Sequence, residues 1–364
     1  MENEKFSIAG HLIGPGQPAL MVAEIGGNHG GDSRLAAAMV RAAAEAGAHA
    51  VKFQAYRAAA FLSRLNPYYE ELAAEELTFT ALHDLSALAK SLGLAVGLTV
   101  FDEEGLELAA GCGADYLKIS SGDLTNTPLL EQAAKAGPPV VVSTGAAYED
   151  EVRSALKSLL SARNRLILLQ CSSLYPAPPE TVNLAVMRRW LDEGLSAGYS
   201  DHVQGLSAAK MALALGAIML EKHFTTDPEL PGGDNSMSMN PAELRELMRW
   251  SAGPEKGRSA KKDDSVLEVD GWGINNDFEL LWGQPEKKPH QLEVPVRPLI
   301  RRAVVAARSL PAGKILAAED LLLRRPPLTD DLIGPDQLTS LPGRVLARGL
   351  SEGEPLGRGD LADG

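Results

Sequence analysis

The sequence contains little cysteine and few aromatic residues: only two of 364 residues are cysteines, and 5% are Phe, Trp or Tyr. Two cysteines are too few for a disulfide framework, which excludes the small disulfide-stapled secreted domains and suits a reducing compartment. No run of about 18 apolar residues could span a membrane, and the first residues, MENEKFSIAG, lack the pattern of a signal peptide. We therefore expect a cytoplasmic protein with no membrane partner.

Positive charge is scarce as well, since the net charge is −13 at pH 7. Such a chain repels nucleic acids and anionic membrane surfaces, which excludes both as main partners, and an anionic ligand would need a local cluster of cations. With 45% hydrophobic and 23% charged residues, the composition is that of a globular protein. We expect a large domain over residues 1–252, a linker over 253–295 and a small domain over 296–364.

Eight short apolar segments recur in the first 252 residues and alternate with helical segments. They cover 18–26, 48–54, 94–101, 114–120, 138–144, 165–171, 195–201 and 216–223. Most are continuous rather than alternating, which is typical of parallel strands covered on both faces. Helices are predicted at 32–47, 81–93, 127–136, 148–162, 182–193, 205–214 and 241–252. The pattern predicts an α/β fold, a (β/α)8 TIM barrel. An open doubly wound sheet is the alternative, but no GxGxxG turn follows the first strand.

Each predicted strand ends in polar or ionisable side chains. They are Glu24, Lys52, Gln54, Thr99, Lys118, Ser121, Ser143, Thr144, Gln170, Ser200, His202, Glu221 and His223. In a barrel the catalytic groups come from the C-terminal ends of the strands, so these side chains predict a site at that rim.

Lys52 and Lys118 end the second and fourth strands, close to several hydroxyl groups. Two ammonium groups and these hydroxyls would hold a phosphate or a carboxylate. A single lysine at a strand end more often extends its amine to solvent, and a lysine of lowered pKa that forms a Schiff base is a second alternative.

His202 and His223 close the last two strands and could bring two imidazoles to one exchangeable divalent cation. The alternative is that each is a hydrogen-bonded structural residue, with Asp201 and Glu221 either as their partners or as rim charges. Glu24 lies in an apolar strand, where its pKa is raised unless a cation pairs with it. It therefore suits acid–base chemistry, or else forms a structural ion pair. We also expect His29 to line the site.

The strand ends also form an ordered series of motifs: AEIGGNHGG, VKFQ, LTVFD, KISSGDLTNTPLL, VVVSTG, QCSSLYPAPPE, GYSDH and EKHFTTD…PGGD…SMNP. This series resembles the sialic acid synthase family, the phosphoenolpyruvate-dependent nonulosonate synthases. The resemblance implies an enzyme, a carbon–carbon bond-forming transferase of the N-acetylneuraminate synthase type. It would condense phosphoenolpyruvate with an open-chain N-acetylated amino sugar, either N-acetylmannosamine or a diacetamido-6-deoxyhexose. The products would be a nine-carbon 2-keto sugar acid and phosphate.

The resemblance also implies roles for individual residues. His202 and His223 would bind Mn²⁺ or Mg²⁺, and Glu24, Lys52 and Lys118 would be catalytic. The residues implied around phosphoenolpyruvate are Lys52, Thr99, Lys118, Ser121, Ser143, Ser173 and Ser200. Those implied to face the sugar are Glu24, Gln54, Asp123, Tyr175 and Asp234.

The chain departs from the family pattern at three places. One is PGGDN, which keeps Asp234 but has glycine where the family usually has proline, followed by Asn235 at a variable position. QCSS replaces HCTS or HCTN, which would change Gln170 and Ser173 near phosphoenolpyruvate. The segment after the second strand does not align firmly, and Asn66 or Ser63 would supply its sugar contact. Two other functions remain as alternatives. A related synthase acting on a phosphorylated sugar would need an arginine cluster for the second phosphate, and a non-catalytic carbohydrate-binding protein would not need the ionisable rim.

The C-terminal region contains an internal repeat. ARSLPAGKILAAEDL (307–321) and ARGLSEGEPLGRGDL (347–361) share AR-x-L-x-x-G-x-x-L-x-x-x-D-L. Two such units predict a small, pseudo-symmetric, mostly β fold, and they are similar to the antifreeze-like (SAF) domain that ends the sialic acid synthases. The resemblance implies a homodimer in which this domain crosses to the partner barrel, so that Arg325 reaches the partner's sugar.

Overall fold

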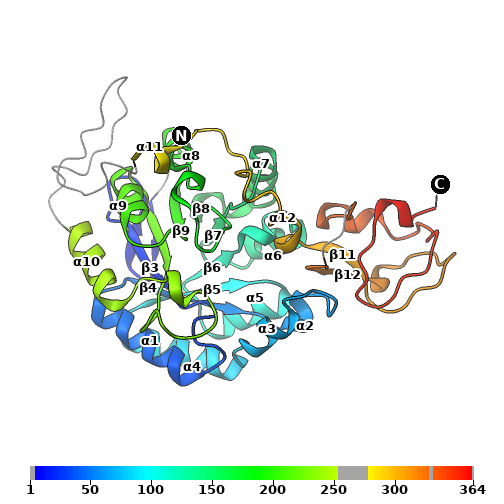
Figure 1. Cartoon of the computed structure of the whole chain (residues 1–364), viewed down its shortest axis with the longest axis horizontal. Coiled ribbons are helices and arrows are strands. Elements are labelled where there is room, and N and C mark those ends of the chain that lie inside the picture. Colours follow the sequence, from blue (N-terminus) through cyan, green and yellow to red (C-terminus); the bar gives the residue numbers. More distant parts are fainter. Residues whose placement is uncertain (1–4, 253–277, 328–330, 363–364) are drawn as a thin grey trace.

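The first large unit is a closed barrel of eight parallel strands (Figure 1). The computed structural model describes residues 5–252, 278–327 and 331–362. The strands are β3 (Leu20–Glu24), β4 (Ala50–Ala55), β5 (Ala95–Val100), β6 (Tyr116–Ile119), β7 (Val140–Ser143), β8 (Leu166–Cys171), β9 (Ala197–Asp201) and β10 (Met219–His223). Each overlaps one of the eight predicted segments, and β10 pairs with β3 to close the barrel. The predicted (β/α)8 barrel is confirmed.

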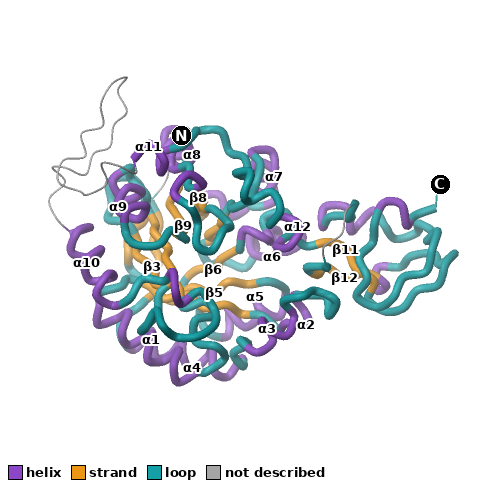
Figure 2. Tube along the Cα trace, in the orientation of Figure 1, coloured by secondary structure: helices purple, strands orange, loops and turns teal. Residues whose placement is uncertain are grey.

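Helices surround the strands (Figure 2). They are α1 (Ser33–Ala46), α4 (Phe79–Ser91), α5 (Glu103–Gly111), α6 (Thr127–Lys135), α7 (Glu149–Ser158), α8 (Leu184–Asp192), α9 (Ser207–Ala214) and α10 (Pro241–Ala252). Local signals define them well: α1 begins after Asp32, which accepts from the Arg34 amide, and ends at Gly47 with φ 91°. Of these eight helices, only α5 has no counterpart among the predicted ones; it contains Gly105 in its first turn and ends at Gly111. No helix in these described ranges is long and apolar enough to cross a membrane.

The N-terminal end of the barrel is closed by a hairpin, β1 (Phe6–Ile8) and β2 (His11–Ile13). Its Ile8 and Ile13 are buried in one apolar cluster with Tyr116 and Ile167 from the barrel interior. The hairpin was not predicted, since each strand has only three residues. Because it fills the lower end, the upper, C-terminal end of the barrel is left for a ligand.

Two segments cover that upper end. The first, the lid (residues 56–78), contains α2 (Ala58–Phe61) and α3 (Tyr69–Ala74). The second, the connecting segment (residues 283–302), follows α11 (Phe278–Trp282) and contains α12 (Arg297–Ile300). It packs on the barrel, where the buried Glu293 carboxylate accepts from the amides of Ala146 at 2.9 Å and Ser173 at 2.7 Å. Residues 253–277 of the predicted linker lie outside the described residues.

The tail domain (residues 303–362) lies beside the barrel, next to α2 and α12 (Figure 1). It contains one antiparallel pair, β11 (Ala303–Ala306) and β12 (Leu321–Arg324), around its own apolar cluster. The two copies of the repeat make equivalent contacts: Arg308 pairs with Asp320, and Arg348 pairs with Asp360. The predicted small β domain with internal pseudo-symmetry is confirmed.

Candidate active site

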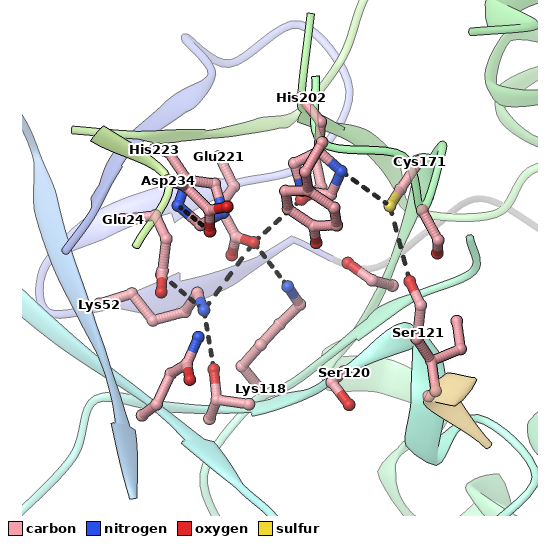
Figure 3. Close-up of a pocket in the computed structure, with 18 of the residues that line it drawn as sticks. Glu24, Lys52, Lys118, Ser120, Ser121, Cys171, His202, Glu221, His223 and Asp234 are labelled. Carbon is pink, nitrogen blue, oxygen red and sulfur yellow. Dashed lines mark hydrogen bonds and ion pairs between the residues drawn. The ribbon is translucent and has the colours of Figure 1, made fainter. Parts of the chain in front are cut away.

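A pocket of about 290 Å³ lies at the C-terminal ends of the strands, and every strand of the barrel contributes at least one side chain to it. The structure brings most of the predicted site residues together there (Figure 3). They are Glu24, Lys52, Gln54, Thr99, Lys118, Ser121, Ser143, Ser173, Tyr175, Ser200, His202, His223, Asp234 and Arg325. The rim is therefore one concave site, lined by residues from distant parts of the sequence.

Two lysine–carboxylate pairs occupy the floor of the pocket. Lys52 Nζ lies 2.5 Å from Glu24 Oε2 and donates to Thr99 Oγ1 at 2.7 Å. Lys118 Nζ donates to Glu221 Oε1 at 2.6 Å, and Lys52 lies 3.9 Å from the same oxygen. All four charged side chains are buried, so each must be paired. Glu221, which could have been only a rim charge, is the partner of both lysines.

The two carboxylates differ in their affinity for protons. Burial raises the pKa of Glu24 to about 7, against the opposing effect of Lys52. Burial acts on Glu221 as well, but Lys118 and Lys52 outweigh it and hold the pKa of Glu221 at about 2. Two neighbouring carboxyl groups with separated pKa values are typical of a site that uses one for proton transfer and the other as a fixed charge. Glu24 is the group that exchanges a proton near neutrality.

These ion pairs also indicate whether either lysine could act as a Schiff-base nucleophile. Burial works against the charged form of Lys52, but Glu221 and Glu24 more than offset it and raise its pKa. Burial lowers the pKa of Lys118, and Glu221 offsets this only in part. A lysine held protonated between two carboxylates is a fixed charge and not a nucleophile, which favours anion binding for Lys52.

His202 and His223 face each other with ring centroids 5.5 Å apart. His202 Nδ1 donates to the Ser172 carbonyl at 2.5 Å, which leaves its Nε2 for a ligand. His223 Nδ1 is buried and has no hydrogen-bond partner. Burial lowers the pKa of His202 to about 4 and holds that of His223 well below its usual value, so both are neutral at pH 7, as metal ligation requires. The pair fits a divalent cation.

No group of three His, Cys, Asp or Glu side chains among the described residues could hold a metal by itself. Substrate and water oxygens would have to complete the coordination of a cation at the two histidines. Asp201, which could have oriented a histidine, pairs with the buried Lys222 at 2.8 Å. The carboxylate of Asp234 lies 3.5 Å from His223 Nδ1.

Asp123 was expected to face the sugar, and this expectation is wrong. Its carboxylate is fully buried and accepts from Arg302 Nε at 2.8 Å. It is absent from the pocket lining because it ends a tight 3-10 turn, Ser121–Asp123, which leaves Ser121 and Gly122 at the pocket.

Gln170 was expected near phosphoenolpyruvate, but its neighbour Cys171 lines the pocket instead. Successive side chains of a strand point to opposite faces. Gln170 therefore points away from the pocket, donates to the Val182 carbonyl at 2.8 Å and accepts from Lys287 at 3.0 Å. His29 does not line the pocket either; its Nδ1 accepts from the Gly31 amide at 3.0 Å.

Ser63 and Asn66 were the two candidates for a sugar contact from the lid, and neither lines the pocket. Both fasten the tail domain instead. Ser63 Oγ donates to the Gly353 carbonyl at 2.7 Å, and Asn66 Nδ2 donates to the Pro326 carbonyl at 2.8 Å. The polar residues of the lid therefore hold the tail domain in place.

Arg325 was expected to reach the barrel of a partner, but in the structure it lines the pocket of its own chain. Its amide donates to the Phe61 carbonyl at 3.1 Å, and its carbonyl accepts from the Ser63 amide at 3.0 Å. Its guanidinium lies 4.1 Å from the centre of the Phe61 ring. Arg325 can reach the pocket of its own chain because the connecting segment packs along the barrel and ends beside that pocket, where Ile300 lines it.

The sequence did not predict an apolar wall at this end of the pocket, formed by Phe61, Leu72, Phe101 and Ile300. Phe101 lies in the motif LTVFD at the end of a predicted strand, so its place at the pocket could have been expected from the sequence. Leu72 and Ile300 carried none, because they come from the lid and the connecting segment, whose positions depend on tertiary packing.

Residues 39–257, more than half of the chain, match the NeuB family, and residues 301–362 match the SAF domain. The chain belongs to the NeuB family. This NeuB-family protein is 36% identical over 363 residues to the N,N'-diacetyllegionaminic acid synthase of Legionella pneumophila, with 94% of each chain covered. It is 31% identical over 330 residues to the N-acetylneuraminate-9-phosphate synthase of Homo sapiens, which covers 86% of this chain and 85% of that protein.

The structure of this NeuB-family protein is also similar to a solved one. It matches the spore coat polysaccharide biosynthesis protein SpsE of Bacillus subtilis with a TM-score of 0.82 and 26% identity, covering 99% of this chain and 100% of the other. Together these relatives confirm the resemblance seen in the motifs. The NeuB-family protein is an enzyme, a transferase that forms a carbon–carbon bond.

Proposed function

We propose that this enzyme condenses phosphoenolpyruvate with an open-chain N-acetylated amino sugar to a nine-carbon 2-keto sugar acid and phosphate. The observation that carries the proposal is the convergence of Lys52, Lys118, Glu24 and two neutral histidines on one pocket. The printed names of the relatives, which are sugar acid synthases, support the product class.

The lysines and a group of hydroxyls suit phosphoenolpyruvate. Ser121 Oγ accepts from the Gly145 amide at 2.9 Å, and a Cβ built on Gly145 would lie 2.1 Å from Ser173 Oγ. Only glycine at this position lets the hydroxyls approach so closely. With Lys118 beside them, these donors form a polar end that would bind a phosphate or carboxylate.

The charge balance of the pocket supports metal dependence. Three cationic side chains (Lys52, Lys118, Arg325) face three carboxylates (Glu24, Glu221, Asp234), and because Glu24 is only partly ionised near pH 7 these groups leave a small excess of positive charge. A phosphoenolpyruvate carrying close to three negative charges would need further positive charge. His202 and His223 would hold Mn²⁺ or Mg²⁺ there, and the cation would supply Lewis-acid polarisation of the acceptor carbonyl.

The reaction joins C3 of phosphoenolpyruvate to the aldehyde carbon of the sugar. Water then adds to C2, and the bond from C2 to the phosphate oxygen breaks, which leaves the 2-keto acid and inorganic phosphate. Lys52 and Lys118 would hold the anionic groups in place throughout. Glu24, with its pKa raised to about 7, would hold or release a proton at its carboxylate oxygens.

The acceptor end of the pocket favours an uncharged sugar with methyl groups. The apolar wall of Phe61, Leu72, Phe101 and Ile300 would pack against acetamido or 6-deoxy methyl groups. Arg325 is the one arginine among the described lining residues, whereas a second phosphate would need a cluster. We therefore favour a diacetamido-6-deoxyhexose over N-acetylmannosamine, and either over a phosphorylated sugar.

Release of inorganic phosphate tests the proposal. The enzyme would be incubated with phosphoenolpyruvate, Mn²⁺ and one acceptor at a time: N-acetylmannosamine, its 6-phosphate, or a 2,4-diacetamido-2,4,6-trideoxyhexose. We expect the highest kcat/KM with the diacetamido sugar and loss of turnover on metal chelation. Release from the phosphorylated sugar alone would favour the alternative synthase, and no release with any sugar would refute the proposed reaction.

The homodimer with exchanged tail domains also remains a proposal, supported by the resemblance. Arg325 would make the same contacts with the pocket whether the tail domain belonged to the same chain or to the partner chain. Mixing Glu24→Gln chains with Arg325→Ala chains distinguishes these arrangements. Exchanged tails would restore activity in the mixture, because one barrel would then have both residues. Unrestored activity would show that each chain uses its own tail. We also propose that the enzyme works in the cytoplasm, which its two free cysteines suit.

A further inference from the structure

One buried arginine of the connecting segment contacts all the parts that meet above the pocket. Arg302 Nε donates to Asp123 Oδ1 at 2.8 Å, and a terminal nitrogen donates to the Phe101 carbonyl at 2.7 Å. The other terminal nitrogen lies 3.1 Å from the Leu323 carbonyl and 3.5 Å from that of Phe61. Barrel loops, lid and tail domain are thus joined through a single guanidinium.

This arrangement requires a guanidinium and a fixed carboxylate. Asp123 is held in place by Ser120 Oγ at 3.0 Å and by Asn126 Nδ2 at 3.1 Å, so it presents a defined oxygen to Arg302. Both side chains of the ion pair are almost completely buried. A buried charge that loses its partner is costly, and a lysine has neither the number nor the planar geometry of donors to replace Arg302.

The groups that Arg302 holds lie next to those that shape the acceptor end. Phe61 belongs to the apolar wall, and its carbonyl accepts from the Arg325 amide. Leu323 lies two residues before Arg325 on the strand that delivers it. Arg302 is not among the residues that line the pocket, so it acts on a ligand only through these neighbours.

We propose that Arg302, together with Asp123, is a positioning residue that sets the acceptor end of the pocket independently of the phosphoenolpyruvate end. It fixes the lid and the tail domain relative to the barrel, and thereby the place of the contacting pair Phe61 and Arg325, beside which the sugar would bind. The kinetic part of this proposal rests on the proposed function, whereas the structural part does not.

Hydrogen exchange followed by mass spectrometry tests the structural part in the full chain. In Arg302→Ala and Asp123→Asn we expect the amides of Ser63 and Arg325, which join lid and tail domain, to exchange at least about tenfold faster. The barrel strands should exchange as in the wild type. Arg308→Ala is the matched control, because it removes an ion pair within the tail domain only. Unchanged exchange at Ser63 and Arg325 would overturn the proposal.

Steady-state kinetics test its consequence. We expect Arg302→Lys and Asp123→Asn to raise the KM for the sugar about tenfold or more while the KM for phosphoenolpyruvate changes less than about twofold. A general loss of stability would instead lower the active fraction and leave both KM values unchanged, which would contradict a positioning role. If the wild type releases no phosphate with any sugar, the proposed reaction fails, and hydrogen exchange still decides the role of Arg302.

Discussion

Replacing Glu221 by glutamine removes the central charge of the pocket floor while keeping its shape. Glu221 Oε1 accepts from Lys118 at 2.6 Å and from Ser200 at 3.0 Å, and lies 3.9 Å from Lys52. The two lysines and the two carboxylates balance in the wild type when Glu24 is ionised. In Glu221→Gln the buried cations outnumber the carboxylates, and Lys118 has no anionic partner.

Removing one partner of a buried ion pair costs about 3–5 kcal/mol of unfolding free energy. Part of this loss is recovered, because Glu221 contributes to the raised pKa of Glu24, and without it Glu24 ionises more readily beside Lys52. We therefore expect the lower end of the range, about 3 kcal/mol at pH 7. Since burial lowers the pKa of Lys118, the folded variant releases this proton at lower pH than the unfolded chain. Stability of the variant consequently recovers as pH rises through that lowered pKa, so the loss becomes smaller in alkaline solution.

Urea unfolding followed by tryptophan fluorescence, which includes the buried Trp190 of α8, measures the difference. Glu246→Gln is the control, because Glu246 pairs with Lys210 at 2.7 Å on the surface with its side chain 54% exposed. Such a pair contributes less than about 1 kcal/mol. If Glu221→Gln costs no more than the control, the four charged side chains do not stabilise one another as a buried cluster.

Three further predictions concern other parts of the pocket. In Gly122→Ala the new Cβ would lie 2.2 Å from the Ile300 carbonyl oxygen, so we expect a higher KM for the sugar. Gly359→Ala is the control, because Gly359 has open space around it and the KM should stay unchanged. An equal KM in both variants would contradict a close contact at Gly122. His223→Ala should abolish turnover with the far-UV circular dichroism spectrum retained; activity that survives both this change and metal chelation would exclude a metal at the histidines. The raised pKa of Glu24 implies that the folded protein keeps a proton that the unfolded chain loses above about pH 4.5. The stabilising contribution of Glu24 is complete below that pH and is lost as pH rises through about 7. In urea unfolding of the metal-free proteins, the unfolding free energy of Glu24→Gln should therefore rise by about 3 kcal/mol relative to the wild type between pH 5 and 8. A difference that stays constant over this range would refute the raised pKa.

Much of the barrel could be predicted because its signals are local. A buried parallel strand needs a continuous apolar run, and α1 needs the cap at Asp32 and the stop at Gly47. The parallel order of the strands then places all their polar ends at one edge, so Glu24 and His223 could be expected in one site although nearly 200 residues separate them. The three-residue strands of the β1–β2 hairpin are too short for such a pattern.

The composition and motifs of the chain were sufficient for the barrel, the repeat of the tail domain and most of the ionisable groups of the pocket. Only the tertiary structure decided which neighbour faces the ligand, as with Cys171 instead of Gln170, because a shift of one residue reverses the face of a strand. It also decided that Asp123 binds Arg302 and that Leu72 and Ile300 form the apolar wall. These contacts join segments distant in the sequence, and their energy arises only when folding brings the segments together, so no local pattern records them.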